Sequence, residues 1–346
     1  MIYALILAGG RGERFWPLSS ENNPKQFHCL YSKSTSFQET IARIKGLIPA
    51  DNIYVSANKQ HRVILEKQLK QFAIPTKNIF FEASPKSTLA PVSFLSAAIL
   101  SKDKNAVIVV LPSDHFIDDR KKFIKIIKKA LNLAKKGYIV CLGKRPDHPE
   151  TGFGYIKLGK KLLANPLAYE AEKFIEKPKK QVARRFVKMR QYLWNCGIFI
   201  FKAETLKEEL KRYAKALYRN LKYADNKAGI AKIWHRLPSV SIDYGIMEKT
   251  RNAAVVCINH KWSDLGSWKS FGEIFKKDKF NNFFKGKVID IGSKNTTVLT
   301  CDRQVATLGL NNIIIVNTKD ALLVCAKDYA QDVKRIVSKL KSERIK

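Results

Sequence analysis

The sequence begins with an apolar run that leads directly into glycines and basic residues. Residues 5 to 27 read LILAGGRGERFWPLSSENNPKQF. Glycines allow successive backbone N–H groups to point into one concavity, where an anion can bind. Arg11, Arg14 and Lys25 would add full positive charges around that anion. These residue types at this spacing predict a site for a phosphate chain.

Two common phosphate-binding loops do not fit this segment. A Walker loop requires GxxxxGK[ST], which is absent here, and a dinucleotide loop GxGxxG begun at Gly10 would find Phe15 in place of its third glycine. Taken alone, GGRG is equally compatible with a plain glycine turn and exposed arginines. The apolar strand before it and Pro24-Lys25 after it favour the phosphate site.

Two aspartates could supply the ligands of a magnesium ion near such a loop. Asp114 ends the segment AVIVVLPSD, so it follows an apolar strand, and ligands of an open α/β sheet lie beyond the carboxyl ends of strands. Asp264 lies between two tryptophans in KWSDLGSW, where an unpaired charge would be costly. Each residue could also be a turn former or a helix cap. Beside a phosphate loop, however, magnesium takes one or two carboxylates together with phosphate oxygens and water.

A mostly parallel sheet must position these residues. Short apolar runs alternate with stretches of helical period, which is typical of βαβ units and predicts an α/β fold. The runs cover residues 2 to 8, 53 to 57, 79 to 82, 106 to 111 and 138 to 143. Ser36 and Glu39 form an S-x-x-E pattern that predicts a capping box at the start of one helix, and another helix follows Asp118.

The pattern changes near residue 280, where short strand-like runs are separated by Gly, Asn and Asp turns. The chain ends in a helical stripe that contains Val333, Ile336 and Leu340, with lysines on the other side. We therefore predict two domains, residues 1–280 and a small β-rich domain, 281–346, that closes with an amphipathic helix.

Composition limits the classes of function. The formal charge is +34, from 64 Lys and Arg against 30 Asp and Glu. The lysines are spread along helical faces and no zinc-finger or RNA-recognition signature accompanies them, so we expect no nucleic-acid partner. No charge-free apolar stretch of about 18 residues occurs and no leader pattern precedes the first strand, so we expect a cytoplasmic protein without a membrane partner. The six cysteines are scattered without a CxxC pair, which favours buried reduced thiols.

Eight segments follow one another as they do in mannose-1-phosphate guanylyltransferases, and the chain resembles this family over nearly its whole length. The segments are LAGGRGERFWPLS, PKQF, LPSDH, PETGFGYI, FIEKP, YLWNCGIFIF, SIDYGIMEK and WSDLGSW. The resemblance implies a Rossmann-like nucleotidyltransferase domain with a mostly parallel, mixed central sheet. It also implies that GTP and mannose 1-phosphate are converted into GDP-mannose and diphosphate with Mg²⁺ as cofactor. The chain ends at Lys346, so we expect the phosphomannose isomerase domain of some relatives to be absent.

The resemblance also implies roles for particular residues. The nucleotide would be bound by Leu7, Ala8, Gly9, Gly10, Gly12, Arg14, Lys25, Glu82, Ser113 and Asp114. Of these, Arg14, Lys25 and Asp114 would be catalytic, and Asp114 and Asp264 would bind the metal. The sugar phosphate would be bound by Gly152, Glu176, Lys177 and Asn195, with Asp243 as support. Without the other motifs, Glu176-Lys177-Pro178 would equally be a solvated strand exit and Asn195 a satisfied core amide.

One segment departs from the family pattern. FEASPKSTLAP, residues 81 to 91, has Lys86 and Ser87 where relatives have Arg and Asn, in a segment associated with the nucleotide base. Another base or hexose therefore stays an alternative, as does a noncatalytic homologue. The β-rich tail either forms a homodimer interface or covers the sheet domain, and the sequence leaves both open.

Overall fold

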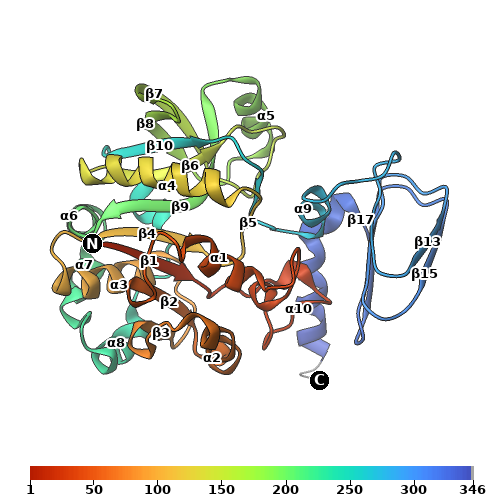
Figure 1. Ribbon diagram of the computed structural model, residues 1–346, viewed down its shortest axis with the longest axis horizontal. Helices are drawn as coiled ribbons and strands as arrows, with labels where there is room; N and C mark the ends of the chain where they lie inside the picture. Colours follow the sequence, from red (N-terminus) through yellow and green to blue (C-terminus); the bar gives the residue numbers. More distant parts are fainter. Residues whose placement is uncertain (344–346) are drawn as a thin grey trace. The chain divides into compact units, whose positions relative to one another are not determined.

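The five apolar runs predicted as strands all lie in one nine-stranded sheet of the computed structural model, which describes residues 1–343 (Figure 1). The strand order is β3-β2-β1-β4-β9-β6-β10-β8-β7. The strands are β1 (Ile2–Leu7), β2 (Ile53–Asn58), β3 (Ile79–Glu82), β4 (Val107–Pro112), β6 (Ile139–Lys144), β7 (Tyr155–Ala164), β8 (Leu167–Ile175), β9 (Tyr192–Lys202) and β10 (Ala253–Ile258). Strands β3, β2, β1 and β4 run parallel, whereas β9 is antiparallel to both β4 and β6. The predicted α/β fold with a mixed sheet is confirmed.

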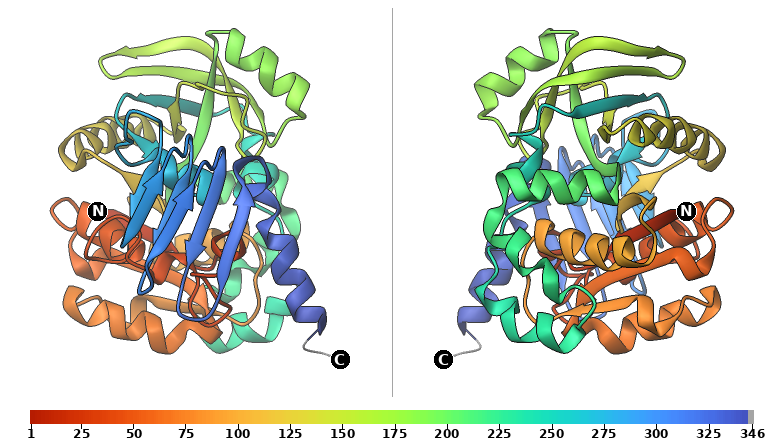
Figure 2. Two further views of the ribbon diagram at one scale, coloured as in Figure 1. Left: turned by 90° about the vertical axis from the view of Figure 1, so that its right-hand side faces the viewer. Right: turned by 90° about the vertical axis from the view of Figure 1, so that its left-hand side faces the viewer.

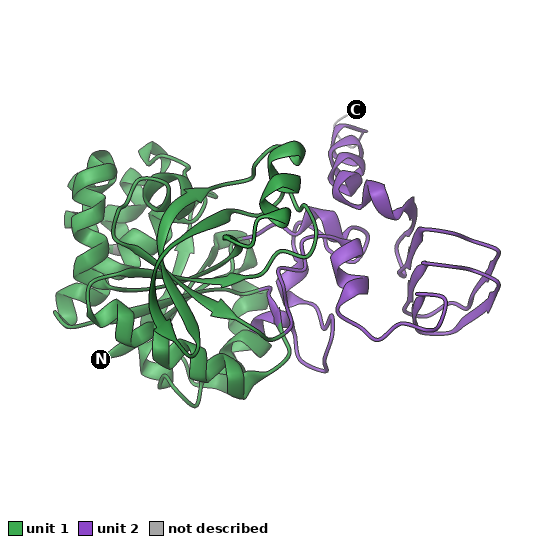
Figure 3. Ribbon diagram, turned by 90° about the horizontal axis from the view of Figure 1, so that it is seen from above, with its two compact units in different colours: residues 1–9, 38–113, 117–260 green, residues 10–37, 114–116, 261–346 purple. Residues whose placement is uncertain are grey.

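The chain folds into two compact units, which Figure 3 colours separately. Unit 1 comprises residues 1–9, 38–113 and 117–260 and contains the nine-stranded sheet. Unit 2 comprises residues 10–37, 114–116 and 261–346. Three parts of the chain thus belong to unit 2: the β-rich tail after residue 280, the glycine-rich loop that begins at Gly10, and residues 114–116 that follow β4. The division of the sequence near residue 280 remains a prediction.

Helices cover the sheet of unit 1. Helix α4 packs along β4, β6, β9 and β10, and α3 packs on α6. Every second residue of β4, Ile108 and Val110, belongs to the same buried cluster as the apolar residues of α3 and α6. The helices are α1 (Ser36–Ile44, which begins in unit 2), α2 (Arg62–Leu69), α3 (Leu89–Lys102), α4 (Arg120–Lys135), α5 (Lys180–Lys188), α6 (Ala203–Tyr213), α7 (Lys215–Asn220) and α8 (Lys227–Ile233). A π-helix, η9 (Asp243–Met247), precedes β10.

The tail of unit 2 is a coil of stacked strands, which Figure 2 shows side by side. One sheet has the order β12-β14-β16-β17 and a second pairs β13 with β15. Asn281, Asn295 and Asn312 have left-handed backbones at successive turns, and their side-chain amides form a hydrogen-bonded ladder. Asparagine tolerates this conformation better than most residues. The elements are β12 (Phe283–Lys285), β13 (Val288–Ile291), β14 (Thr297–Thr300), β15 (Val305–Leu308), β16 (Ile313–Asn317), β17 (Leu322–Ala326) and α10 (Val333–Glu343).

Three short elements complete the frame of unit 2: the 3₁₀ turns η1 (Glu13–Phe15) and η2 (Lys25–Phe27), and helix α9 (Trp268–Glu273). Strand β11 (Trp262–Ser263) precedes α9, and the two-residue strand β5 (Phe116–Ile117) lies where the chain returns to unit 1. Phe15 of η1 packs in one apolar core with Trp268, Phe271 and residues of the tail. The glycine-rich loop and the tail of unit 2 are therefore held by a shared core.

Two expectations about local structure need correction. Ser36 is the first residue of α1, and among the described residues its buried Oγ has no hydrogen-bond partner, so the predicted capping box is not formed. All six cysteines are free, but Cys29 and Cys301 are exposed, not buried. Within residues 1–343, every helix is too short or too polar to span a bilayer.

Candidate active site

The glycine-rich loop is fixed by a close approach of two chain segments. Gly12 has a φ of 63° and caps η1, and an added Cβ there would lie 2.6 Å from Cβ of Lys25. Ser19 donates a hydrogen bond to the carbonyl of Gly12, and Gln26 donates one to the carbonyl of Gly10. Glycine is therefore required at position 12 for both conformation and space.

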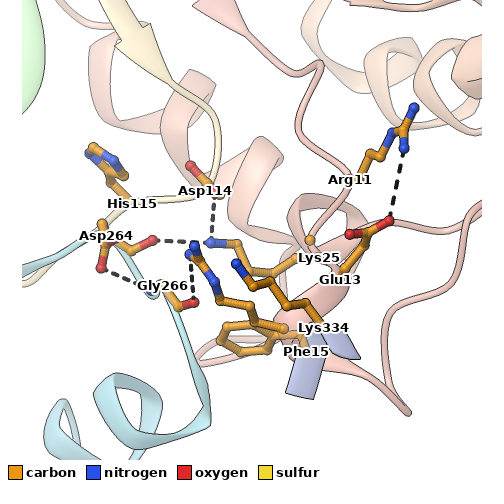
Figure 4. Close-up of a pocket in the computed structure, with 11 residues that line it drawn as sticks. Arg11, Glu13, Phe15, Lys25, Asp114, His115, Asp264, Gly266 and Lys334 are labelled. Atoms are coloured by element: carbon orange, nitrogen blue, oxygen red, sulfur yellow. Dashed lines mark hydrogen bonds and ion pairs between the residues drawn. The ribbon is translucent and has the colours of Figure 1, made fainter. Parts of the chain in front are cut away.

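The loop borders a cavity of about 310 Å³ that lies entirely within unit 2 (Figure 4). Its lining is rich in charge: four basic residues, three carboxylates and a histidine. The lining residues are Arg11, Gly12, Glu13, Arg14, Phe15, Lys25, Asp114, His115, Asp264, Gly266 and Lys334. Arg14, Lys25, Asp114 and Asp264, predicted from separate motifs, are thus brought together.

Lys25 is the centre of this arrangement. Its side chain is buried, and its Nζ lies 2.6 Å from Oδ2 of Asp114. The same nitrogen donates hydrogen bonds to the carbonyls of Leu265, at 2.7 Å, and Asp264, at 3.0 Å. All three N–H donors of the ammonium group are therefore used. Lys25 ties the residue after β4 to the segment that follows β11.

Asp114 is held as a carboxylate. Burial would raise its pKa, but the charges of Lys25 and His115 and the hydrogen bond from Lys25 together keep the pKa below its usual value. Its side chain is still 30% exposed, so the carboxylate is accessible from the cavity. A negative charge at this position is therefore present at neutral pH.

Asp264 provides the second carboxylate of the cavity. Its Oδ1 accepts a hydrogen bond from the backbone N–H of Gly266, at 2.8 Å. Carboxylate oxygens are the ligands that a hard divalent cation prefers, so Asp114 and Asp264 fit such an ion. Within residues 1–343, no three His, Cys, Asp or Glu side chains cluster closely enough to hold a metal by themselves. Phosphate oxygens would therefore have to supply further ligands.

Of the other predicted nucleotide residues, Gly10 begins unit 2, whereas Leu7, Ala8, Gly9, Glu82 and Ser113 lie in unit 1 at the carboxyl ends of neighbouring strands. Ser113 donates its N–H to the carbonyl of Leu7, and Ala8 donates to the carbonyl of Ser56. Glu82 ends β3 and accepts a hydrogen bond from Oγ of Ser56. Burial, opposed by that hydrogen bond, raises the pKa of Glu82 to about 6. A Cβ on Gly9 would lie 3.3 Å from the Glu82 carboxylate, so this end of the sheet is tightly packed.

Three of the predicted sugar-phosphate residues form a second polar cluster in unit 1. Oε1 of Glu176 lies 3.2 Å from Nζ of Lys177, and Nδ2 of Asn195 donates to Oδ1 of Asp243 at 2.9 Å. Asp243 starts the π-helix, and Lys177 has a strained left-handed backbone with a φ of 48°. Both features recur at functional sites. Gly152, the fourth residue, donates its N–H to Glu150.

The carboxyl groups of Glu176 and Asp243 influence each other. Burial and the neighbouring charge of Asp243 raise the pKa of Glu176 to about 7, and burial also raises the pKa of Asp243. Among the described residues, the buried Oε2 of Glu176 has no hydrogen-bond partner. This oxygen lies 2.5 Å from the position of a Cβ on Gly154, so a side chain there would displace it. An unsatisfied buried acceptor suits a ligand hydroxyl.

Sequence reasoning missed several of these residues. Lys334 and His115 line the cavity, and Glu248 accepts a hydrogen bond from the N–H of Glu176. His115 and Glu248 lie inside the motifs LPSDH and SIDYGIMEK, and these motifs are the signal that could have found them. Lys334 had no local signal, because it is one of many lysines on the polar side of the last helix.

Two family models match consecutive parts of the chain. Residues 3–280 match the nucleotidyl transferase family, and residues 286–340 match the MannoseP isomerase/GMP-like beta-helix domain. Mannose-1-phosphate guanylyltransferase of Salmonella montevideo is 39% identical, over 99% of this chain and 74% of the relative. The protein of the same name from Escherichia coli is 36% identical, over 97% of this chain and 75% of the relative.

The chain belongs to the mannose-1-phosphate guanylyltransferase family.

A solved structure agrees with this membership of the guanylyltransferase family. The crystal structure described as mannose-1-phosphate geranyltransferase from Thermus thermophilus is 31% identical and superimposes with a TM-score of 0.90. The match covers 98% of this chain and 99% of that chain. Nucleotidyl transferases typically use a divalent metal, which agrees with the carboxylates of the unit 2 cavity.

Proposed function

We propose that the protein is a mannose-1-phosphate guanylyltransferase, which converts GTP and mannose 1-phosphate into GDP-mannose and diphosphate. The relatives that match nearly the whole of this chain support this activity. The observation that carries it is the cavity in which Lys25 joins Asp114 to the Asp264 segment beside the arginines of the glycine-rich loop. The cavity combines cations for a triphosphate with carboxylates for a metal.

The reaction needs no nucleophile from the protein. A phosphate oxygen of mannose 1-phosphate forms a bond to the α-phosphorus of GTP, and the bond from that phosphorus to the oxygen bridging to the β-phosphate breaks. The electron pair leaves with diphosphate, and no proton has to move. Because two polyanions must meet, charge neutralisation and alignment supply most of the catalysis.

On the nucleotide side, Arg14 and the backbone of the glycine-rich loop bind the phosphates. Lys25 fixes Asp114 and the Asp264 segment, because its ammonium already contacts both. Asp114 and Asp264 hold the divalent ion, which we propose is Mg²⁺. When bound, this ion supplies positive charge next to the reacting phosphates.

On the sugar side, Glu176 and Asn195 bind hydroxyls of the hexose, since one offers a free acceptor and the other an amide N–H. Asp243 fixes the orientation of the Asn195 amide through the hydrogen bond between them. Lys177 contacts the sugar phosphate, and Gly152 offers backbone atoms at the edge of the cluster.

A nucleotidyltransferase with another substrate would differ from a guanylyltransferase in the base that it selects. Lys86, which replaces the family arginine, donates hydrogen bonds to the carbonyls of His235 and Leu237, at 2.8 and 2.7 Å. Ser87 has a φ of 59°. Lys86 thus anchors the segment, and we propose that guanine is read by neighbouring atoms, without a contact from this ammonium. GTP stays the proposed nucleotide on the strength of the relatives.

The tail of unit 2 suits a homodimer. Ile291 and Leu308 are opposite each other in the β13–β15 pair, and their side chains are 64% and 73% exposed. Exposed neighbouring aliphatic side chains favour burial against a second copy. Light scattering would report a dimer, which Ile291→Lys should convert to a monomer. A cytoplasmic location is also proposed, on the sequence alone.

The first experiment is an assay of diphosphate release with Mg²⁺, mannose 1-phosphate and each of the four NTPs separately. Release with GTP alone is expected. Asp114→Asn should lower kcat/KM about 100-fold or more, the scale of losing one preorganised electrostatic contact. Asp302→Asn, at an exposed turn of the tail, is the control and should have no effect. Activity with another NTP only, or full activity of Asp114→Asn, would contradict the proposal.

A further inference from the structure

Two cations of the unit 2 cavity, Arg14 and Lys334, form no ion pair with any residue that the structure describes. Asp114 pairs with Lys25, and Glu13 lies 3.9 Å from Arg11. Within the described part of the chain, Arg14 donates to a single acceptor, the carbonyl of Gly266, at 3.4 Å. Across residues 1–343, the ammonium of Lys334 has neither an ion pair nor a hydrogen bond. Four basic side chains line the cavity against three carboxylates, so the lining carries a net positive charge that an anion would neutralise.

Helix α10 places Lys334 at the cavity from the far end of the sequence. Val333 is 2% exposed and belongs to the same core as Phe15 of η1. Two turns further along, Nζ of Lys341 lies 3.2 Å from Oε1 of Glu13. Helix α10 is thus attached to the glycine-rich loop through an apolar contact and an ion pair. Lys334, next to the buried Val333, is directed toward the cavity, as Figure 4 shows.

We infer that Lys334 binds the terminal phosphates of the nucleotide, the part that leaves as diphosphate. This inference rests on the proposed function. Lysine suits the role because its ammonium is a compact point charge with three rotatable donors. The donors of Lys25 are already used by Asp114 and backbone carbonyls, so Lys334 and Arg14 are available for the β- and γ-phosphates. Arg11, 3.9 Å from a Glu13 that also pairs with Lys341, is a further cation at the edge of the cavity.

The inference gives the tail of unit 2 a part in substrate binding. The β-rich coil carries α10, and α10 supplies a side chain to the cavity. Lys334 is predicted to strengthen the binding of GTP and of diphosphate, which carry the terminal phosphates, and to leave the binding of mannose 1-phosphate unchanged. This difference separates a phosphate-binding residue from a general positive charge.

The test compares Lys334→Met with Lys339→Met on the same helix. Lys339 has a side chain that is 78% exposed and pairs only with Glu343, at 3.9 Å, so it controls for lost charge and helix propensity. Steady-state kinetics would be measured in both directions, with GTP and mannose 1-phosphate and with GDP-mannose and diphosphate. Binding of inorganic diphosphate with Mg²⁺ would be measured by calorimetry.

Lys334→Met should raise KM for GTP and for diphosphate about tenfold, as expected for the loss of one hydrogen bond to a charged group. KM for mannose 1-phosphate should stay within about twofold, and Lys334→Arg should recover most of the loss. Equal diphosphate affinity in Lys334→Met and Lys339→Met would overturn the inference. If wild-type protein forms no GDP-mannose, the proposed function fails, and the calorimetric comparison decides separately whether Lys334 binds diphosphate.

Discussion

Replacing Gly12 with alanine tests whether the glycine-rich loop is built as the structure indicates. The backbone of Gly12 has a φ of 63°, in the left-handed region. A Cβ at this position would lie 2.6 Å from Cβ of Lys25 and 2.8 Å from its backbone nitrogen. Gly10 is the matched control, because a Cβ there would have no atom within 4 Å.

The expected cost of Gly12→Ala has two parts. The left-handed backbone costs an alanine roughly 1–2 kcal/mol. The overlap with Lys25 adds about 1–3 kcal/mol, as overpacking does in a close-packed interior. To reach an ordinary contact of 3.4 Å, the loop and Lys25 must separate by roughly 0.8 Å. Since Lys25 contacts Asp114, this displacement would also disturb the cavity.

Both consequences can be measured. Urea denaturation should show a loss of about 2–5 kcal/mol in Gly12→Ala and less than about 0.5 kcal/mol in Gly10→Ala. If the loop moves to relieve the strain, stability is partly regained but kcat/KM for GTP falls, by about 100-fold for a displacement near 1 Å. A Gly12→Ala protein with the stability and the kcat/KM of wild type would refute the proposed conformation of the loop.

Two further predictions concern unit 1. Glu176 has a pKa of about 7 in the folded protein and an ordinary value of 4.5, so the folded state retains a proton that the unfolded state has lost between these pH values. The stability that this proton provides is fully present below pH 4.5 and is lost as the pH rises through about 7. In urea titrations, the free energy of unfolding of Glu176→Gln should therefore rise relative to that of wild type from pH 5 to pH 8. A difference between the two proteins that stays constant over this range would contradict the raised pKa. Lys86→Met should leave the carbonyls of His235 and Leu237 without a donor and cost about 1–3 kcal/mol in the same assay, whereas unchanged stability would show that Lys86 anchors nothing.

Local sequence patterns were sufficient for most of the elements in unit 1. The apolar run at residues 53 to 57 became β2, Ile53–Asn58, and the run at 79 to 82 became β3, Ile79–Glu82. These strands are buried on both faces, so they read as continuous apolar runs. The capping box at Ser36 was wrong although α1 begins at this residue, because a short pattern of side chains does not fix their hydrogen bonds once tertiary packing buries the serine hydroxyl.

Only part of the candidate site could be predicted from the sequence. The types of Arg14, Lys25, Asp114 and Asp264, together with their place after strands and glycines, indicated a phosphate and metal site before any fold was known. Their roles as ligands remain predictions. The bond from Lys25 to the backbone of Asp264 joins residues 239 positions apart, and no local pattern records such a distance.

The sequence by itself determined the class of fold and the family, and it predicted a phosphate site at the glycine-rich loop, because these depend on periodicity and on motifs of neighbouring residues. Tertiary structure alone decided that Lys334 borders the same cavity as Lys25, and that Asp243 accepts a hydrogen bond from Asn195. The physical reason is that the sequence pattern around a lysine on a polar helix face is the same whether its side chain contacts solvent or lines a cavity. Only the packing of the helix, here of Val333 in the core that contains Phe15, decides whether the lysine contacts solvent or the cavity.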